Sequence, residues 1–501
     1  MSNRRAPIPL TAPIDETDDA PLQSFWWLKR MVMVSVLFIV FACGSWLWLD
    51  HRAERRLAAE IQEWKREGLP IEPKDFEQPP VPDEENAAVA LSSAAKLVVF
   101  SEEWHRAEND EEFDKHPWST HAREVADRTL VKNRAASAAL RAARELTITR
   151  WALVRGEDVF SNNQKKAGQI DLSAMWSLGQ MTMFAAQSAQ ERGDDEAFLE
   201  YLKDVRFVAL GTASDPGAAS YLTGTGIDYR GIRLASAEAH HLRLGTPPAR
   251  TMARELIKDW LSENDLNTKA WVHTANEATL YLDLQRSVEP PKVLHWNDGD
   301  PKSERPTRAI WRLLRPLRIA CLTPTLIYAR HETQASRLSN WPAVSTAIST
   351  LPPPQTLKNN VEPINTAIQS VNQVGFIGER FFRISFNRRV NATVAAIQFA
   401  CRLYSIDHNG KNPANLNELV PDYLPAVPLN LLDPKGGTFR IHTATTQPFI
   451  YGVGIGTDLV ANGTWMPMLA QHEDFSSGIF VSFLNPYPNT ATTLPSTLPM
   501  P

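Results

Sequence analysis

The chain has few of the residues that usually mark a chemical site. It contains three cysteines among 501 residues, Cys43, Cys321 and Cys401, and no two of them form a Cys-x-x-C motif. This spacing excludes the common zinc-binding and dithiol redox patterns. Two alternatives stay open for Cys321 and Cys401, which are a disulfide in an oxidising compartment or two buried free thiols.

Catalytic motifs are absent from the sequence as well. The chain contains no Gly-x-Ser-x-Gly elbow, no Gly-rich phosphate loop that ends in Lys-Ser or Lys-Thr, and no His-Glu-x-x-His zinc motif. The catalytic residues are therefore unknown. The missing motifs favour a protein that is not an enzyme, but they do not exclude an enzyme.

Weak metal candidates are His273 and Glu277, which stand four positions apart and so share one face of a predicted helix. No third ligand accompanies them, and we interpret them as a hydrogen-bonded pair. His240 and His241 are adjacent, so on a helix we expect them to point in different directions. The sequence predicts no metal and no cofactor.

Neither sign of charge dominates the chain. It has 52 Lys and Arg against 57 Asp and Glu, and no segment concentrates positive charge on the scale that binding to a phosphate backbone needs. Nucleic acid is therefore not an expected partner. The apolar fraction of 43% is that of ordinary globular proteins, so we expect most of the chain to fold.

Long hydrophobic runs are also scarce, and the sequence has one. Residues 31–49 are uncharged and apolar over a length that crosses a bilayer. Trp26 and Trp27 precede this run, and Trp46 and Trp48 close it, as expected of rings that prefer the depth of the lipid headgroups. We predict a single membrane-spanning anchor over residues 25–49, with the bilayer as its partner.

The charges that flank the anchor do not settle its orientation. Arg52, Arg55 and Arg56 follow the anchor, while Lys29 and Arg30 precede it, so a literal count places the carboxyl side in the cytoplasm. Long domains, however, translocate largely regardless of charge. We interpret the segment as an uncleaved signal anchor in the inner (cytoplasmic) membrane, with the body of the protein on the extracytoplasmic side.

After the anchor, residues 50–82 predict a helical stalk followed by a Pro-rich linker. Ala53, Leu57 and Trp64 recur at helical spacing, and Gly68 is a helix stop. At ~1.5 Å per residue, a free stalk would hold the body roughly 25 Å from the membrane.

Residues 83–340 predict a mainly α domain, either a helical bundle or an irregular solenoid. Asp83 is the expected cap of its first helix, and Gly193-Asp194 is expected to end one helix and cap the next. A further helix is expected from Trp311 to Ser339, with interruptions near Pro316 and Pro324.

The remaining residues divide into a connector, an α+β module and the two tails. We predict the connector over 341–384 and a small α+β module over 385–485, with a helix from about Arg388 and three strands around Arg440, Ile450 and Phe480. The Pro- and Asp-rich residues 1–24 and the final residues 486–501 are expected to be disordered tails.

The carboxyl-terminal segment resembles the globular region of type II secretion pseudopilins. The residues that carry the resemblance are Tyr404, Asp407-x-x-Gly410, Asn412-Pro413, Leu416-x-x-Leu419, Val420-Pro421-x-Tyr423-Leu424, Pro428, Asp433-Pro434-x-Gly436 and Tyr451-Gly452-Val453-Gly454. The chain also resembles uncharacterised single-pass membrane-anchored bacterial proteins, in which a similar anchor is followed by a segment like Pro80 to Ala88. The resemblance implies a fold and no activity.

Departures from the pseudopilin pattern limit what the resemblance implies. A pseudopilin has a processed leader directly before its apolar helix and a glutamate just inside it, and residues 20–49 show neither. Asp458 is the sole acid in its glycine-rich segment, too few oxygen ligands for calcium. We expect the fold without filament assembly and without calcium.

Three functional hypotheses follow. The leading one is a membrane-tethered scaffold or protein-interaction component of the cell envelope, whose protein partner is unknown. A second is an extracytoplasmic hydrolase whose site assembles only in three dimensions, because catalytic triads follow no fixed order in sequence. A third, suggested by the pseudopilin resemblance alone, is a protein associated with the secretion machinery.

Overall fold

The structure is a computed structural model, and it describes most of the folded body. The residues described are 24–76, 79–113, 117–152, 170–262, six positions between 272 and 282, 312–335, 362–431, 437–442, 449–452 and 480–483. Over 362–383 it describes the backbone alone. The tails predicted at 1–24 and 486–501 lie outside these residues, except for Ser24.

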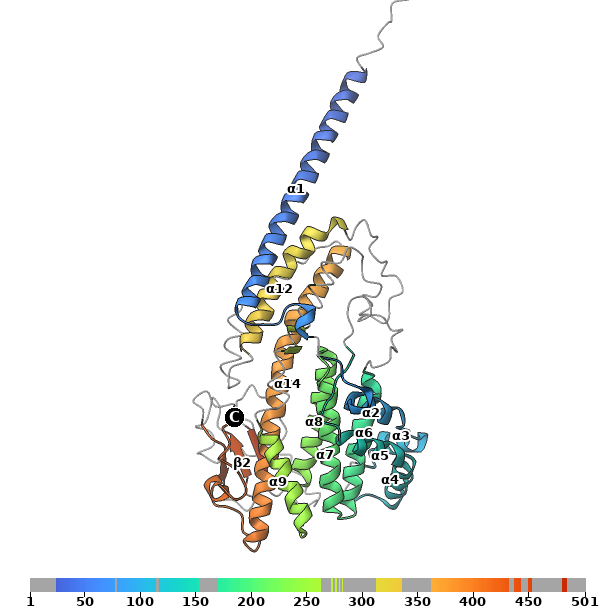
Figure 1. The fold of residues 1–501 in the computed structure, drawn as a ribbon, viewed down its shortest axis with the longest axis vertical. Helices are drawn as coiled ribbons and strands as arrows, with labels where there is room; N and C mark the ends of the chain where they lie inside the picture. The colour runs from blue at the N-terminus through green and yellow to red at the C-terminus, as the bar shows by residue number, and fades with distance from the viewer. Residues whose placement is uncertain are drawn as a thin grey trace, which may run out of the picture.

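The chain is mostly helical and begins with one long helix, α1 (Ser24–Arg66). Its first half carries exposed large apolar side chains, from Trp26 to Leu49, and projects from the body (Figure 1). Among the described residues this is the one helix long and apolar enough to span a membrane. The helix stops where Gly68 takes a φ of +68°, as the sequence predicts.

The second half of α1 is not the free stalk that the sequence suggested. It lies along α12 (Arg315–Ala335), and Leu57 and Trp64 are fully buried against Leu322 and Leu326 of that helix. The apolar face that predicted a helix therefore serves to pack it onto the body. The expected spacing of roughly 25 Å between body and membrane is wrong, because the body begins where the apolar run ends.

The ion pairs between α1 and α12 fix the direction of packing. Arg315 pairs with Asp50, and Arg330 donates to Glu60 at 2.6 Å, so the two helices run in the same direction. Pro316 lies in the first turn of α12, where no backbone donor is needed. The interruption expected at Pro324 does not occur, since α12 continues through it.

The middle of the chain is helical where the structure describes it. Asp194 accepts a hydrogen bond from the Ala197 amide and caps α7 (Asp195–Ala213), while Gly193 takes a φ of +69°, so the predicted turn is confirmed. The helices are α2 (Ala87–Lys96), α3 (Glu102–Asn109), α4 (Thr120–Lys132), α5 (Arg134–Arg144), α6 (Leu172–Glu191), α7 (Asp195–Ala213), α8 (Ala218–Glu238) and α9 (Pro247–Leu261).

A second long helix, α14 (Glu362–Asp407), corrects the expected connector. Its backbone is helical from Glu362, so the part of the predicted connector that is described is helix. The part over 341–361 lies outside the described residues. α14 packs on α8 and α9 (Figure 1), and Phe399 meets Trp260 edge to face with ring centroids 5.2 Å apart.

A small sheet follows α14. Strands β1 (Arg440–His442), β2 (Phe449–Gly452) and β3 (Phe480–Phe483) pair antiparallel in the order β1-β2-β3, with Ile441 opposite Ile450. All three predicted strands form. Ile450 is fully buried in a cluster that also contains Leu199 of α7 and Ile397 of α14. The hydrophobic core therefore continues across the boundary predicted at residue 385.

Candidate binding cleft

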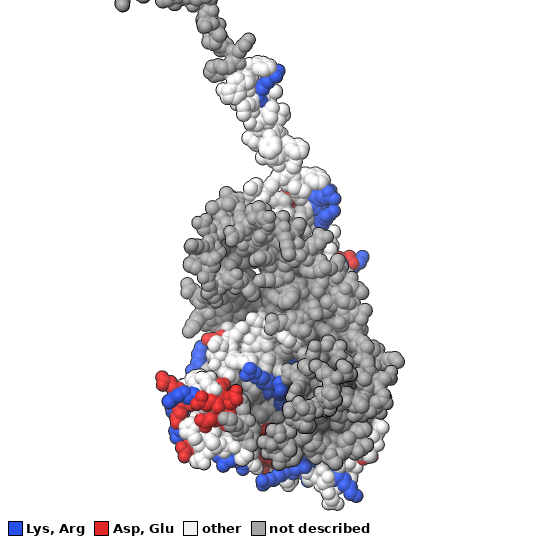
Figure 2. All heavy atoms as spheres, turned by 180° about the vertical axis from the view of Figure 1, so that it is seen from behind, with Lys and Arg blue, Asp and Glu red and all other residues white. Residues whose placement is uncertain are grey.

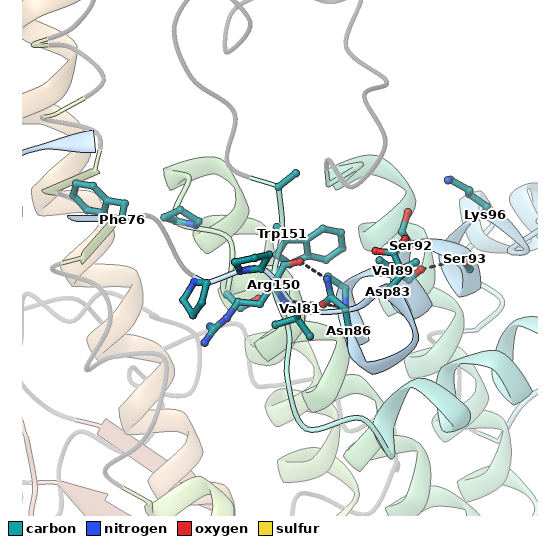
Figure 3. A pocket seen from close by; sticks show the side chains of 16 residues that line it. Phe76, Val81, Asp83, Asn86, Val89, Ser92, Ser93, Lys96, Arg150 and Trp151 are labelled. Atoms are coloured by element: carbon teal, nitrogen blue, oxygen red, sulfur yellow. Dashed lines mark hydrogen bonds between the residues drawn. The ribbon is translucent and has the colours of Figure 1, made fainter. Parts of the chain in front are cut away.

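A cleft of about 570 Å³ lies at one end of the helical domain, where three separate segments meet (Figure 3). The first segment runs from the Pro-rich linker into α2, the second follows α5, and the third is the turn between α7 and α8. Its lining residues are Phe76, Pro79, Pro80, Val81, Asp83, Asn86, Ala88, Val89, Ser92, Ser93, Lys96, Arg150, Trp151, Ala152, Ser214 and Pro216.

Asn86 holds the first two segments together. Its side-chain Nδ2 donates to the Arg150 carbonyl at 2.8 Å, and its Oδ1 accepts from the Arg150 amide at 2.9 Å (Figure 3). The same oxygen accepts from the Ala88 amide and caps α2, so the helix begins after Asn86. The cap expected at Asp83 is wrong, because residues 83–85 form a separate turn of 3₁₀ helix, η2.

Trp151 joins the second segment to the end of α7, next to the third segment. Its indole Nε1 donates to the Gly211 carbonyl near the end of α7 at 2.7 Å. This bond satisfies the polar end of the ring while its apolar body packs against the buried cluster that contains Val208. The cleft is therefore preformed, because hydrogen bonds within the fold hold the backbone on both sides of it.

The cleft combines apolar walls with a few charges. Val81, Val89 and Trp151 are partly exposed, as expected of side chains that can still contact a ligand. Among the described residues the Nε of Arg150 is buried without a hydrogen-bond partner. The described lining contains neither His nor Cys, and an apolar surface with a few polar anchors suits binding of an extended segment.

The weak metal candidates lie elsewhere. His273 is buried with its ring 4.5 Å from the ring of Tyr221, and Glu277 lies outside the described residues. Within the part of the chain that the structure describes, no three His, Cys, Asp or Glu side chains gather as metal ligands. The pairing of His273 with Glu277 stays a prediction.

The two adjacent histidines correct another expectation. α8 ends at Glu238, so His240 and His241 lie in a turn, and their ring centroids are 3.6 Å apart. Burial, together with the neighbouring His241, lowers the pKa of His240 to about 4. The rings therefore face each other, where helical geometry had predicted divergence.

The structure describes one thiol of the Cys321 and Cys401 pair. Cys401 is a free, buried cysteine on α14, and burial raises the pKa of its thiol. The Cys321 side chain lies outside the described residues. Buried in apolar surroundings and kept protonated, the Cys401 thiol acts as a small apolar side chain.

The pseudopilin-like residues that are described serve packing and turn formation. Asp407 accepts hydrogen bonds from Arg250 at 2.7 Å and from the Tyr423 hydroxyl at 2.9 Å. Burial and Asp407 raise the pKa of Tyr423 to about 12. Gly410 takes a φ of +83°, which explains a glycine there. Leu416, Leu419 and Leu424 are buried. Asp458 lies outside the described residues.

One segment that lines the cleft was notable in the sequence because of a family resemblance and not because of a binding motif. The segment Pro80 to Ala88 carried the resemblance to membrane-anchored proteins, and it supplies five of the described lining residues, namely Pro80, Val81, Asp83, Asn86 and Ala88. The cleft walls at Trp151 and Pro216 could not be predicted from the sequence, because neither residue belongs to a motif.

Comparisons with protein-family models, curated proteins and solved structures find no match.

Proposed function

We propose that the protein is a membrane-tethered scaffold of the cell envelope whose cleft binds an extended segment of a partner protein. The observation that carries this proposal is the preformed cleft on a body joined directly to a helix that is long and apolar enough to span a membrane. A rigid wall lowers the ordering cost of binding, and partly exposed Val81, Val89 and Trp151 offer apolar contact.

Site-directed photo-crosslinking in intact membranes tests this proposal. A photoreactive residue at Val89 is expected to give a discrete adduct with one partner, and Val81→Asp is expected to abolish that adduct by placing a carboxylate in the apolar wall. The matched control is Val131, which is 61% exposed on α4 and does not line the cleft. No adduct at Val89, or the same adduct at Val131, overturns the proposal.

We also propose that the body lies on the extracytoplasmic side of the inner membrane. The support is one apolar helix followed by a large folded body, which can translocate despite the arginines beyond the anchor. A reporter that is active only outside the cytoplasm, fused after Pro501, is expected to be active. A cytoplasmic reporter that is active at the same position instead reverses the orientation.

For the carboxyl-terminal region we propose a pseudopilin-like α+β arrangement without filament assembly. Its support is the sheet β1-β2-β3, which follows α14 and carries a buried Ile450. Amides of β2 are expected to show protection from hydrogen exchange, since β2 is the central strand. Exchange of the β2 amides at the unprotected rate contradicts the arrangement.

A further inference from the structure

A groove between α1 and α12 begins where the apolar run of α1 ends. It measures about 890 Å³, and its lining extends along α1 from Leu49 to Glu63 and along α12 from Ala320 to Arg330. On the α1 wall, the apolar residues Leu49, Ala53 and Ala59 alternate with charged ones. The end at Leu49 is called the mouth of the groove below.

With α1 across a bilayer, the mouth would lie at the level of the lipid headgroups. Trp46 and Trp48 close the apolar run, and rings of this kind settle at the membrane interface. Trp46 Nε1 donates to the Leu313 carbonyl at 2.7 Å, so the chain just before α12 reaches the same depth. Leu313 is 64% exposed there, which suits contact with lipid. By helical rise, Arg52 and Arg56 lie ~6 and ~12 Å beyond Trp48.

The charge at the mouth is positive and has no acidic partner among the described residues, and the Arg52 guanidinium lies 5.1 Å from the centroid of the Trp48 ring. The two acids in this part of α1, Asp50 and Glu54, both pair with Arg315. Arg52 and Arg56 line the groove and form no ion pair with any residue that the structure describes. Figure 2 shows Lys and Arg side chains gathered where the apolar helix meets the body.

The far end of the groove is neutralised. Arg330 donates to Glu60 at 2.6 Å and to Glu67 at 2.5 Å, while Glu63 pairs with Arg66. The positive potential is therefore concentrated at the end nearest the membrane. An occupant must combine a negative group near Arg52 and Arg56 with an apolar part next to Leu49 and Ala53.

We propose that the groove binds an anionic phospholipid from the leaflet on the side of the body. Its phosphate lies between Arg52 and Arg56, because guanidinium groups match phosphate oxygens in charge and in bidentate geometry. The glycerol and upper acyl segments lie against Leu49 and Ala53, continuous with the bilayer around α1. The proposal does not depend on the partner-binding cleft.

Lipid retention by the full-length protein, purified in a nonionic detergent, tests this proposal. Native mass spectrometry with added phosphatidylglycerol or phosphatidylcholine measures binding, and the shift in Tm on adding each lipid gives a second readout. We expect phosphatidylglycerol to be retained and to raise the Tm. In Arg52→Gln and in Arg56→Gln its affinity should fall roughly tenfold, as for loss of a charged hydrogen bond.

Arg55→Gln is the matched control. Arg55 is exposed, carries the same charge, lies beside Arg56 in sequence and does not line the groove. Its variant is expected to bind phosphatidylglycerol like the unaltered protein. Arg56→Lys keeps the charge without the bidentate fork and is expected to bind with intermediate affinity. The Tm without added lipid shows whether each variant is folded.

Three outcomes overturn the proposal. Equal losses in Arg55→Gln and Arg56→Gln would mean diffuse attraction to the surface rather than a site. Equal retention of phosphatidylcholine would mean that the charge at the mouth does not select the lipid. Stabilisation by inorganic phosphate to the same extent as by phosphatidylglycerol would assign a free-anion site. None of these outcomes bears on the crosslink at Val89.

Discussion

Three buried charges form a cluster that joins three helices. Asp228 on α8 is 2% exposed and accepts from Arg206 of α7 at 3.1 Å and from Arg388 of α14 at 2.5 Å. Arg388 is fully buried. The residues are ordinary charges in the sequence, and the 160 positions between Asp228 and Arg388 hide the contact. A buried charge is tolerated here because it is paired.

Removal of the central carboxylate should be costly. Asp228→Ala leaves two buried guanidinium groups without their shared acceptor, so we expect the free energy of unfolding to fall by ~3–5 kcal/mol. Chemical denaturation of the full-length protein in detergent, followed by circular dichroism, measures this loss. The control is Lys203→Ala, which breaks a pair with Glu255 at the surface and should cost no more than ~1 kcal/mol. Equal losses in both variants would contradict a structural role for Asp228.

At the scale of elements, a signal that acts only on neighbouring residues predicts the structure, whereas long-range contacts and helix lengths leave no such signal. The Gly193-Asp194 turn was predictable because both residues act on their immediate neighbours. α2 begins three residues beyond the expected cap Asp83, since Asn86 caps the helix and also binds the distant backbone of Arg150. α14 begins near Glu362, well before the apolar pattern that marked its second half.

The contact between α7 and α8 depends on a glycine that sequence alone cannot interpret. A Cβ at Gly224 of α8 would lie 2.5 Å from the Ala209 carbonyl oxygen and 2.8 Å from the Ala213 amide of α7. Backbone atoms cannot move aside as a flexible side chain can, so the two helices would have to separate. Gly224 therefore sets how closely the helices approach.

Gly224→Ala is expected to destabilise the protein despite the better helix propensity of alanine. Overpacking against backbone should lower the free energy of unfolding by about 1–3 kcal/mol. Gly245→Ala is the matched control, because a Cβ there has no neighbour within 4 Å and the residue does not have positive φ. Thermal unfolding of both variants decides the point, and a Tm for Gly224→Ala at or above that of Gly245→Ala would refute the close contact.

Across the whole molecule, the anchor and the helical class follow from the sequence, while the assembly does not. The uncharged, apolar composition of residues 31–49 is enough to predict a membrane anchor. The cleft forms where three segments meet, near Asn86, Trp151 and Pro216. The groove forms between α1 and α12, and Arg315 of α12 lies more than 260 positions from its partner Glu54 on α1. Pairing over such distances leaves no periodic signal in the sequence.

The continuous core makes a final prediction about cooperativity. Ile397 of α14 is fully buried in the cluster that also holds Leu256 of α9 and Ile232 of α8. Ile397→Ala should therefore lower the free energy of unfolding by ~2–5 kcal/mol. Because the three helices share this core, hydrogen exchange should accelerate to a similar extent in the most protected amides of α8, α9 and α14.

A domain boundary at residue 385 would give a different exchange pattern. If α14 and the sheet folded as a separate module, Ile397→Ala would release their amides and leave α8 and α9 protected. Leu97→Ala, at a position 45% exposed, is the control and should change none of them. Loss of protection in all three helices would mean that the carboxyl-terminal segment unfolds together with α8 and α9 as one cooperative unit.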